Sequence, residues 1–126
     1  MALSILLVDD NAVQAGTRQI ILRRAGYHVL AVLSAERALE QIRSGEFAVP
    51  LGLVITDHMM PGMDGADFVR LLRGTHPMLP VMVISGMDDA ESEYDGLGVT
   101  FRLKPLLPDV LLANVLALMP AEMAEG

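Results

Sequence analysis

The sequence predicts an α/β fold: a doubly wound, five-stranded parallel sheet with helices on both faces. Two observations support this prediction. Five short β-like runs alternate along the chain with stretches of helical periodicity. The runs are almost continuously apolar, whereas strands with one solvated face would alternate apolar and polar residues. Both faces of the sheet should therefore be covered by helices, and each connection between strands should be a right-handed crossover.

The elements are expected in strict alternation. Strands are predicted over residues 4–8, 27–32, 51–56, 80–85 and 99–103, and helices over 12–25, 35–43, 66–73, a brief stretch within 87–96, and 107–119. In the first helix four residues recur with helical spacing and share one face: Val13, Thr17, Ile20 and Ile21. Gly26 is a typical end for this helix, and the Pro-Gly-Met-Asp-Gly run over residues 61–65 predicts a turn.

Composition limits the function classes. The 126 residues fit one domain, which we place over residues 1–126 as a unit that a longer protein could contain. A hydrophobic content of 52% and a mean hydropathy of +0.45 exclude intrinsic disorder. With no cysteine, a disulfide framework and a thiolate metal site are excluded. The net charge of −7 is the wrong sign for direct nucleic-acid binding. No run of ~18 apolar residues occurs, and charge appears by Asp9, so we expect no membrane span, no secretory signal and a cytoplasmic location.

Polar residues follow four of the five predicted strands. Strand one leads into Asp9-Asp10, strand three into Asp57, strand four ends in Ser85 and strand five leads into Lys104. Strand two leads into residues 33–35, which offer nothing comparable. A strand order of 2-1-3-4-5 would make the four polar ends neighbours, at the edge where open α/β sheets bind ligands. The sequence therefore predicts one polar site there.

Three carboxylates in one pocket repel one another, and a divalent cation relieves that repulsion. Oxygen ligands with open positions suit Mg²⁺. The alternative is that Asp9-Asp10 simply caps the following helix, although the pair together with Asp57 is harder to explain in that way. Lys104 is the only lysine in the chain, and its compact charge suits a phosphate oxygen. Ser85 by itself is an ordinary turn serine, but in this company it is a candidate hydroxyl donor. Together these groups describe phosphoryl transfer to an aspartate.

With those residues placed, the chain resembles the receiver domain of two-component response regulators, from Ile5 to about Met119. The motifs that carry the resemblance lie at residues 6–10, 54–65, 83–86 and 101–105, in order and at characteristic intervals. The resemblance implies a flavodoxin-like fold and a phosphorylation-dependent signalling switch whose phosphoryl donor is a histidine kinase or a phosphotransfer protein. The resemblance implies that the domain is regulatory rather than enzymatic, with at most self-phosphorylation and self-dephosphorylation activity.

The resemblance also assigns roles residue by residue. Asp57 matches the phosphoacceptor, with Lys104 and Ser85 as its catalytic partners. Mg²⁺ would be held by Asp9, Asp10, Asp57 and the backbone carbonyl of Met59. Ser85 and Phe101 match the switch pair. The chain departs from the common pattern in having serine at position 85, phenylalanine at position 101, and only a brief fourth helix, which in many receivers belongs to the output surface.

Two other functions are alternatives to the phosphorylated switch. A Mg²⁺-dependent phosphatase acting through an aspartyl-phosphate would want a second acid two residues after the nucleophile, where this chain has Met59. A docking module that is never phosphorylated would not need the intact set of polar residues. His58 is expected to point away from the site because successive strand residues face opposite sides. His28 and His76 are expected at the surface.

The last helix is unusually apolar. Six of its residues cover an arc of roughly 160°, wider than the ~100° stripe of a surface helix: Leu111, Leu112, Val115, Leu116, Leu118 and Met119. Two interpretations remain open. The helix either packs deeply on the sheet, or it keeps an apolar shoulder for a partner, a second copy of the chain or a linked effector domain.

Overall fold

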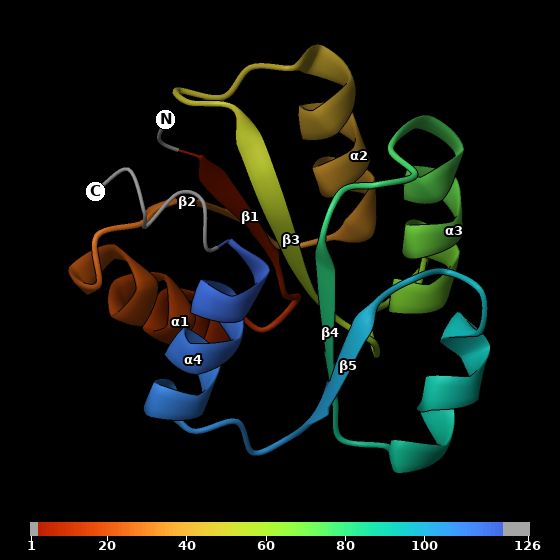
Figure 1. The fold of residues 1–126 in the computed structure, drawn as a ribbon. Coiled ribbons are helices and arrows are strands. Elements are labelled where there is room, and N and C mark those ends of the chain that lie inside the picture. Colours follow the sequence, from red (N-terminus) through yellow and green to blue (C-terminus); the bar gives the residue numbers. More distant parts are fainter. Residues whose placement is uncertain (1–2, 120–126) are drawn as a thin grey trace.

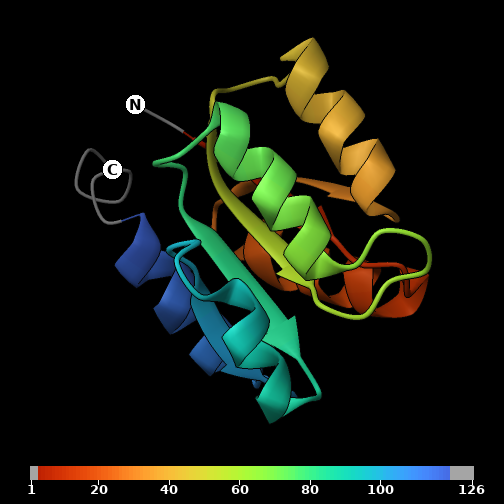
Figure 2. The same ribbon diagram turned by 90° about the vertical axis from the view of Figure 1, so that its right-hand side faces the viewer.

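A computed structural model describes residues 3–119, which form a five-stranded parallel sheet between two layers of helices (Figures 1 and 2). The strand order is β2-β1-β3-β4-β5, and every neighbouring pair is parallel, as predicted. The strands are β1 Ser4–Val8, β2 His28–Val32, β3 Leu51–Asp57, β4 Val81–Ser85 and β5 Thr100–Leu103.

The helices are α1 Ala12–Arg24, α2 Ala35–Ser44, α3 Gly65–Thr75, a short 3₁₀ helix η1 Asp88–Tyr94, and α4 Pro108–Leu118. The predicted brief fourth helix is thus η1. Side chains cap three of the helices, because Asn11, Ser34 and Asp64 each accept from backbone N–H groups of the first turn. Gly26 follows the end of α1 with a φ of 100°, which glycine adopts without strain.

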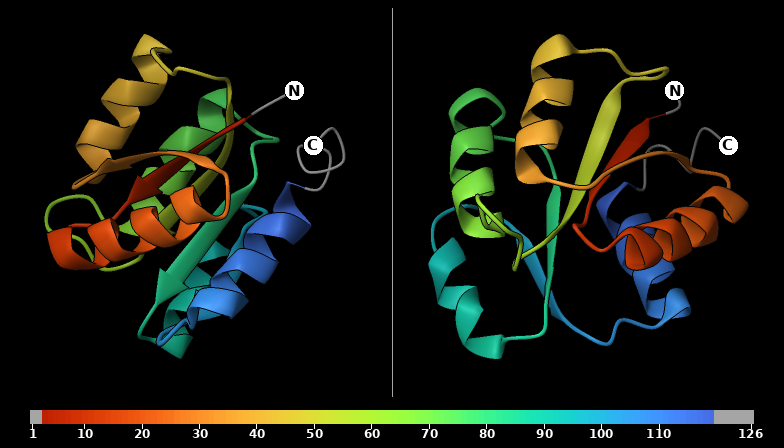
Figure 3. Two further views of the ribbon diagram at one scale, coloured as in Figure 1. Left: turned by 90° about the vertical axis from the view of Figure 1, so that its left-hand side faces the viewer. Right: turned by 180° about the vertical axis from the view of Figure 1, so that it is seen from behind.

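Different helices cover the two faces of the sheet (Figure 3), and each face carries its own apolar core. Helices α1 and α4 cover one face, where Ile5, Leu7, Leu22, Leu111 and Val115 meet. Helices α2 and α3, with η1, cover the other face, where the core includes Leu6, Val8, Val54, Phe68 and Tyr94. Alternate residues of β1 therefore enter opposite cores, which explains why its run is continuously apolar.

Of the four residues that share the helical period in α1, only Ile21 packs partly against the core. Val13 is 78% exposed and Ile20 is 53% exposed, whereas Ala15 and Leu22 are buried. The small Ala15 side chain lets the helix approach the sheet, and Leu22 fills the core beneath the other end. This rotation brings Gln14 and Arg18 onto the side that borders the polar site.

The last helix combines both interpretations left open by the sequence. Leu111, Val115 and Met119 are buried against the sheet and α1, so one side packs deeply. Two large apolar side chains of the helix, Val110 and Leu116, are exposed, as are Leu107 just before it and Leu103 at the end of β5. Within residues 3–119, none of the helices has the length and apolarity needed to cross a bilayer.

Candidate functional site

The polar site lies at the carboxyl edge of the sheet, where β1 and β3 end side by side. Asp9 follows β1 and is fully buried, Asp57 is the last residue of β3 and is 3% exposed, and Asp10 is exposed. Carboxylate oxygens of all three lie within 4.8 Å of one another. The parallel pairing of β1 with β3 holds them together, because it sets Val8 beside Thr56 immediately before the acidic residues.

Helix capping does not explain the acidic pair. Asn11 is the residue that caps α1, and its side-chain oxygen accepts from the N–H groups of Val13 and Gln14, both at 3.0 Å. The Asp9 carboxylate instead accepts from the backbone N–H of Asn11 at 2.9 Å and faces the end of the sheet. The capping alternative is therefore wrong.

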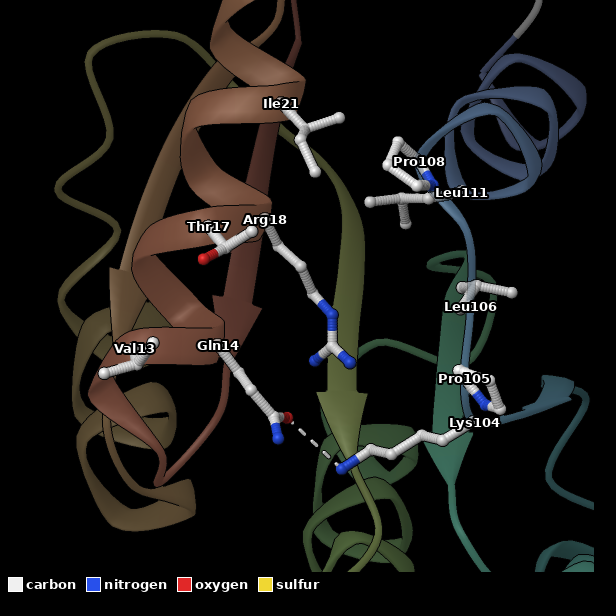
Figure 4. A pocket seen from close by; sticks show the side chains of 10 residues that line it. All are labelled: Val13, Gln14, Thr17, Arg18, Ile21, Lys104, Pro105, Leu106, Pro108 and Leu111. Carbon is white, nitrogen blue, oxygen red and sulfur yellow. Dashed lines mark hydrogen bonds between the residues drawn. The ribbon is translucent and has the colours of Figure 1, made fainter.

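Two cations face the carboxylates. Lys104 Nζ lies 3.1 Å from Asp57 Oδ1 and donates to Gln14 Oε1 at 3.4 Å (Figure 4). Arg18 Nη1 lies 2.8 Å from Asp9 Oδ2 and 3.6 Å from Asp57 Oδ1. Sequence reasoning missed Arg18 and Gln14. Their spacing of four residues on the helix that follows the acidic pair was the available signal, because it places them on one face.

Asp57 is electrostatically unusual. Burial, followed by the hydrogen bond and charge of Asp9, raises its pKa to about 7, and Lys104 opposes that rise only in part. Among the described residues, Asp57 Oδ1 is also the one buried side-chain oxygen without a hydrogen-bond donor, despite its ion pair with Lys104. A buried, unsatisfied carboxylate oxygen beside two further carboxylates offers the oxygen donors that a hard divalent cation needs, so these residues fit Mg²⁺.

Ser85 and Phe101 belong to the neighbouring strands β4 and β5, and their described partners are Met87 and Tyr94. Ser85 is buried at the end of β4, and its hydroxyl donates to the carbonyl of Met87 at 3.2 Å and accepts from the N–H of Met87 at 3.0 Å. Phe101 is half-buried, with its ring 5.9 Å from that of Tyr94. The side chain of Met59 is 64% exposed in the turn after β3.

His58 has its partners in η1. It is buried, its Nδ1 lies 2.7 Å from Tyr94 Oη, and its Nε2 lies 3.4 Å from Glu93 Oε2. Burial, followed by the nearby acidic groups, raises the pKa of Tyr94, so its phenol stays neutral at physiological pH. Tyr94 was not singled out in the sequence, and it links the residue after Asp57 to Phe101. His28 is exposed as expected, and His76 is half-buried beside Thr75.

Comparisons with known proteins identify the family of this chain. Residues 5–115 match the protein family described as the response regulator receiver domain. The transcriptional regulatory protein ZraR of Escherichia coli K12 is 31% identical over 90% of this chain and 25% of its own length. The response regulator MprA of Mycobacterium tuberculosis is 33% identical over 100% of this chain and 56% of its own length. The chain thus spans between a quarter and just over half of these curated relatives.

Solved structures show the same fold. A response regulator receiver protein from Pseudomonas putida is 30% identical, with a TM-score of 0.79 over 97% of this chain and 98% of that one. The chemotaxis response regulator CheY4 of Vibrio cholerae is similar in fold at 23% identity, with a TM-score of 0.83 over 94% of this chain and 100% of that one.

Proposed function

Because this chain belongs to the response regulator receiver domain family, we propose that Asp57 is its phosphoacceptor and that phosphorylation there switches its signalling state. Receiver domains are regulatory parts of two-component signal transduction. The phosphoryl donor on this proposal is a phosphohistidine of a histidine kinase or of a phosphotransfer protein. The observation that carries the proposal is the buried carboxylate of Asp57, whose Oδ1 faces Lys104 Nζ at 3.1 Å.

The chemistry requires one bond to form and one to break. A carboxylate oxygen of Asp57 attacks the phosphorus, and the P–N bond to the donor imidazole breaks, with the electron pair leaving on the imidazole. Lys104 supplies positive charge to the phosphoryl oxygens. Mg²⁺, when bound, would neutralise further charge on those oxygens. Asp9, Asp10, Asp57 and the backbone carbonyl of Met59 would hold it.

The switch rests on two side chains. The Ser85 hydroxyl would exchange its hydrogen bonds with Met87 for one to the new phosphoryl group. Phe101, already half-buried against Tyr94, would then move further inward. Phosphorylation would thereby bias an equilibrium between two arrangements of this edge. We assign α4, whose Val110 and Leu116 side chains are exposed, to contact with a second copy or a linked effector domain.

The experiment is intact-mass spectrometry after incubation with Mg²⁺ and acetyl phosphate, on the wild type and on Asp57→Asn. We expect a single phosphoryl adduct on the wild type and none on the variant. A phosphoryl adduct on Asp57→Asn would place the acceptor elsewhere. If the wild type gains no adduct and a phosphoryl analogue such as beryllofluoride also fails to bind, the protein is a docking module. Release of inorganic phosphate from phosphomonoesters would favour the phosphatase, which Met59 argues against.

A further inference from the structure

We propose that Arg18 is a built-in cation that holds the carboxylates of Asp9 and Asp57 in the metal-free protein, so that a divalent ion must displace its guanidinium to bind. The inference rests on the proposed function, because it concerns the same acidic site. Arg18 thereby lowers the affinity of the site for divalent cations.

The geometry places one nitrogen of Arg18 between the two buried carboxylates. Arg18 Nη1 lies 2.8 Å from Asp9 Oδ2, a hydrogen-bond distance, and 3.6 Å from Asp57 Oδ1. The Arg18 side chain is itself only 13% exposed, and the side chains of Asp9 and Asp57 are 0% and 3% exposed. Screening by water is therefore weak, and the charge-assisted contact with Asp9 is stronger than a surface ion pair. A guanidinium stays charged at every physiological pH, so this cation is always present.

A metal ion and the guanidinium need the same oxygens. Mg²⁺ takes oxygen ligands at about 2.0–2.1 Å in near-octahedral geometry. If Asp9 and Asp57 are among those ligands, the ion lies within a few ångströms of Arg18 Nη1, where two cations repel. Lys104 differs from Arg18 in that its ammonium pairs with Asp57, at 3.1 Å, whereas Arg18 Nη1 reaches both Asp9 and Asp57.

The structure provides room for the displaced side chain. A groove of about 570 Å³ opens beside Arg18 between α1 and the chain leading into α4. Figure 4 shows Arg18 pointing along this groove toward the end of β3, with Gln14 and Lys104 on its polar side and Ile21, Leu106 and Leu111 on its apolar side. The aliphatic stem of Arg18 can lie against these apolar side chains while its head moves outward to water.

The test is the Mg²⁺ affinity of the metal-free protein, measured from backbone amide shifts in ¹H–¹⁵N NMR titrations of Arg18→Gln, Arg18→Lys and the wild type. Arg24→Gln is the matched control. Arg24 is exposed in the last turn of the same helix, so its replacement removes one positive charge at a solvent-exposed position. Loss of one charge-assisted hydrogen bond corresponds to about a tenfold change in an equilibrium constant. We expect Arg18→Gln to bind Mg²⁺ about tenfold more tightly than wild type, with Arg24→Gln close to wild type and Arg18→Lys between them.

The wild type gives a second readout that does not depend on a variant folding. The Nε–Hε resonance of Arg18 should shift on adding Mg²⁺, with the same apparent Kd as the amides around Asp9 and Asp57. An unmoved Arg18 resonance, or equal Kd values for wild type and Arg18→Gln, would overturn the inference while leaving the metal site intact. If neither protein shows saturable Mg²⁺ binding, the metal site of the proposed function fails, and this inference fails with it. If Arg18→Gln keeps its Mg²⁺ affinity but loses beryllofluoride binding, Arg18 is a ligand of the phosphoryl group instead.

Discussion

The carboxyl group of Asp57 lowers the stability of the folded protein at neutral and alkaline pH. In the metal-free fold its pKa is raised from 3.8 to about 7, first by burial and then by the neighbouring Asp9 carboxylate. The folded state therefore holds the Asp57 proton more tightly than the unfolded state does. Its stabilising contribution is complete below about pH 4 and is lost as the pH rises through 7, because the folded protein must then carry an unfavourable buried charge.

The stability of Asp57→Asn relative to wild type should accordingly be greater at pH 8 than at pH 5, by on the order of 2 kcal/mol. The amide removes the repulsion with Asp9 and has no proton to lose. Urea denaturation of both proteins in EDTA, at the two pH values, measures the difference. A stability difference that does not change between pH 5 and pH 8 would contradict the raised pKa of Asp57.

At the scale of the element, α3 approaches the site more closely than an ordinary helix start would allow. A Cβ atom on Gly65, its first residue, would lie 2.5 Å from Tyr94 Oη and 2.6 Å from the backbone carbonyl oxygen of Asp57. The Gly65 N–H also donates to the carbonyl of His58 at 2.8 Å. The absence of a side chain at Gly65 thus lets α3, η1 and the end of β3 meet.

Gly65→Ala should destabilise the fold by about 2–3 kcal/mol, because backbone and a buried phenol must move to admit the methyl group. Gly74 is the matched control in the same helix, since a Cβ there meets no atom within 4 Å. Gly74→Ala should stabilise the fold by about 0.5–1 kcal/mol, as is usual for removing glycine from a helix. Urea denaturation of both variants gives the two signs. If Gly65→Ala leaves the free energy of unfolding unchanged, Gly65 does not determine how closely α3 approaches the end of β3.

For the whole molecule, the acidic site should couple metal binding to global stability. A ligand that binds only the folded state stabilises it by mass action, by about 1.4 kcal/mol at ten times its Kd. The fold is complete without the ion because two apolar cores hold the sheet. Removing Mg²⁺ should therefore leave the protein folded.

Adding millimolar Mg²⁺ should raise the melting temperature by a few degrees over NaCl of equal ionic strength. Asp10→Ala is the informative variant, because Asp10 is exposed and its loss removes one proposed metal ligand without disturbing the core. We expect that variant to keep its metal-free melting temperature and to lose the response to Mg²⁺. The proposed site is refuted if the wild-type midpoint stays constant in Mg²⁺ concentrations at which related carboxylate sites saturate.

Much of this protein was predictable from the sequence. The apolar runs predicted the ends of every strand to within two residues. The strand order followed from requiring that the strands leading to Asp9, Asp57, Ser85 and Lys104 be neighbours. Both are local or topological properties: side chains alternate along a strand, and parallel strands end at a common edge. These two properties were enough to predict that Asp9, Asp10 and Asp57 cluster and that Lys104 lies beside them.

Only the tertiary structure decided which side chains of the helices reach that edge. The rotation of α1 about its axis depends on how Ala15 and Leu22 pack, and that rotation places Arg18 against Asp9, a contact that the helical period of the sequence does not indicate. The pairing of His58 with Tyr94 joins residues 36 positions apart through η1, whose position no local pattern specifies. A sequence determines which residues alternate and which strand ends meet, but long polar side chains find their partners only once packing has fixed the helices in space.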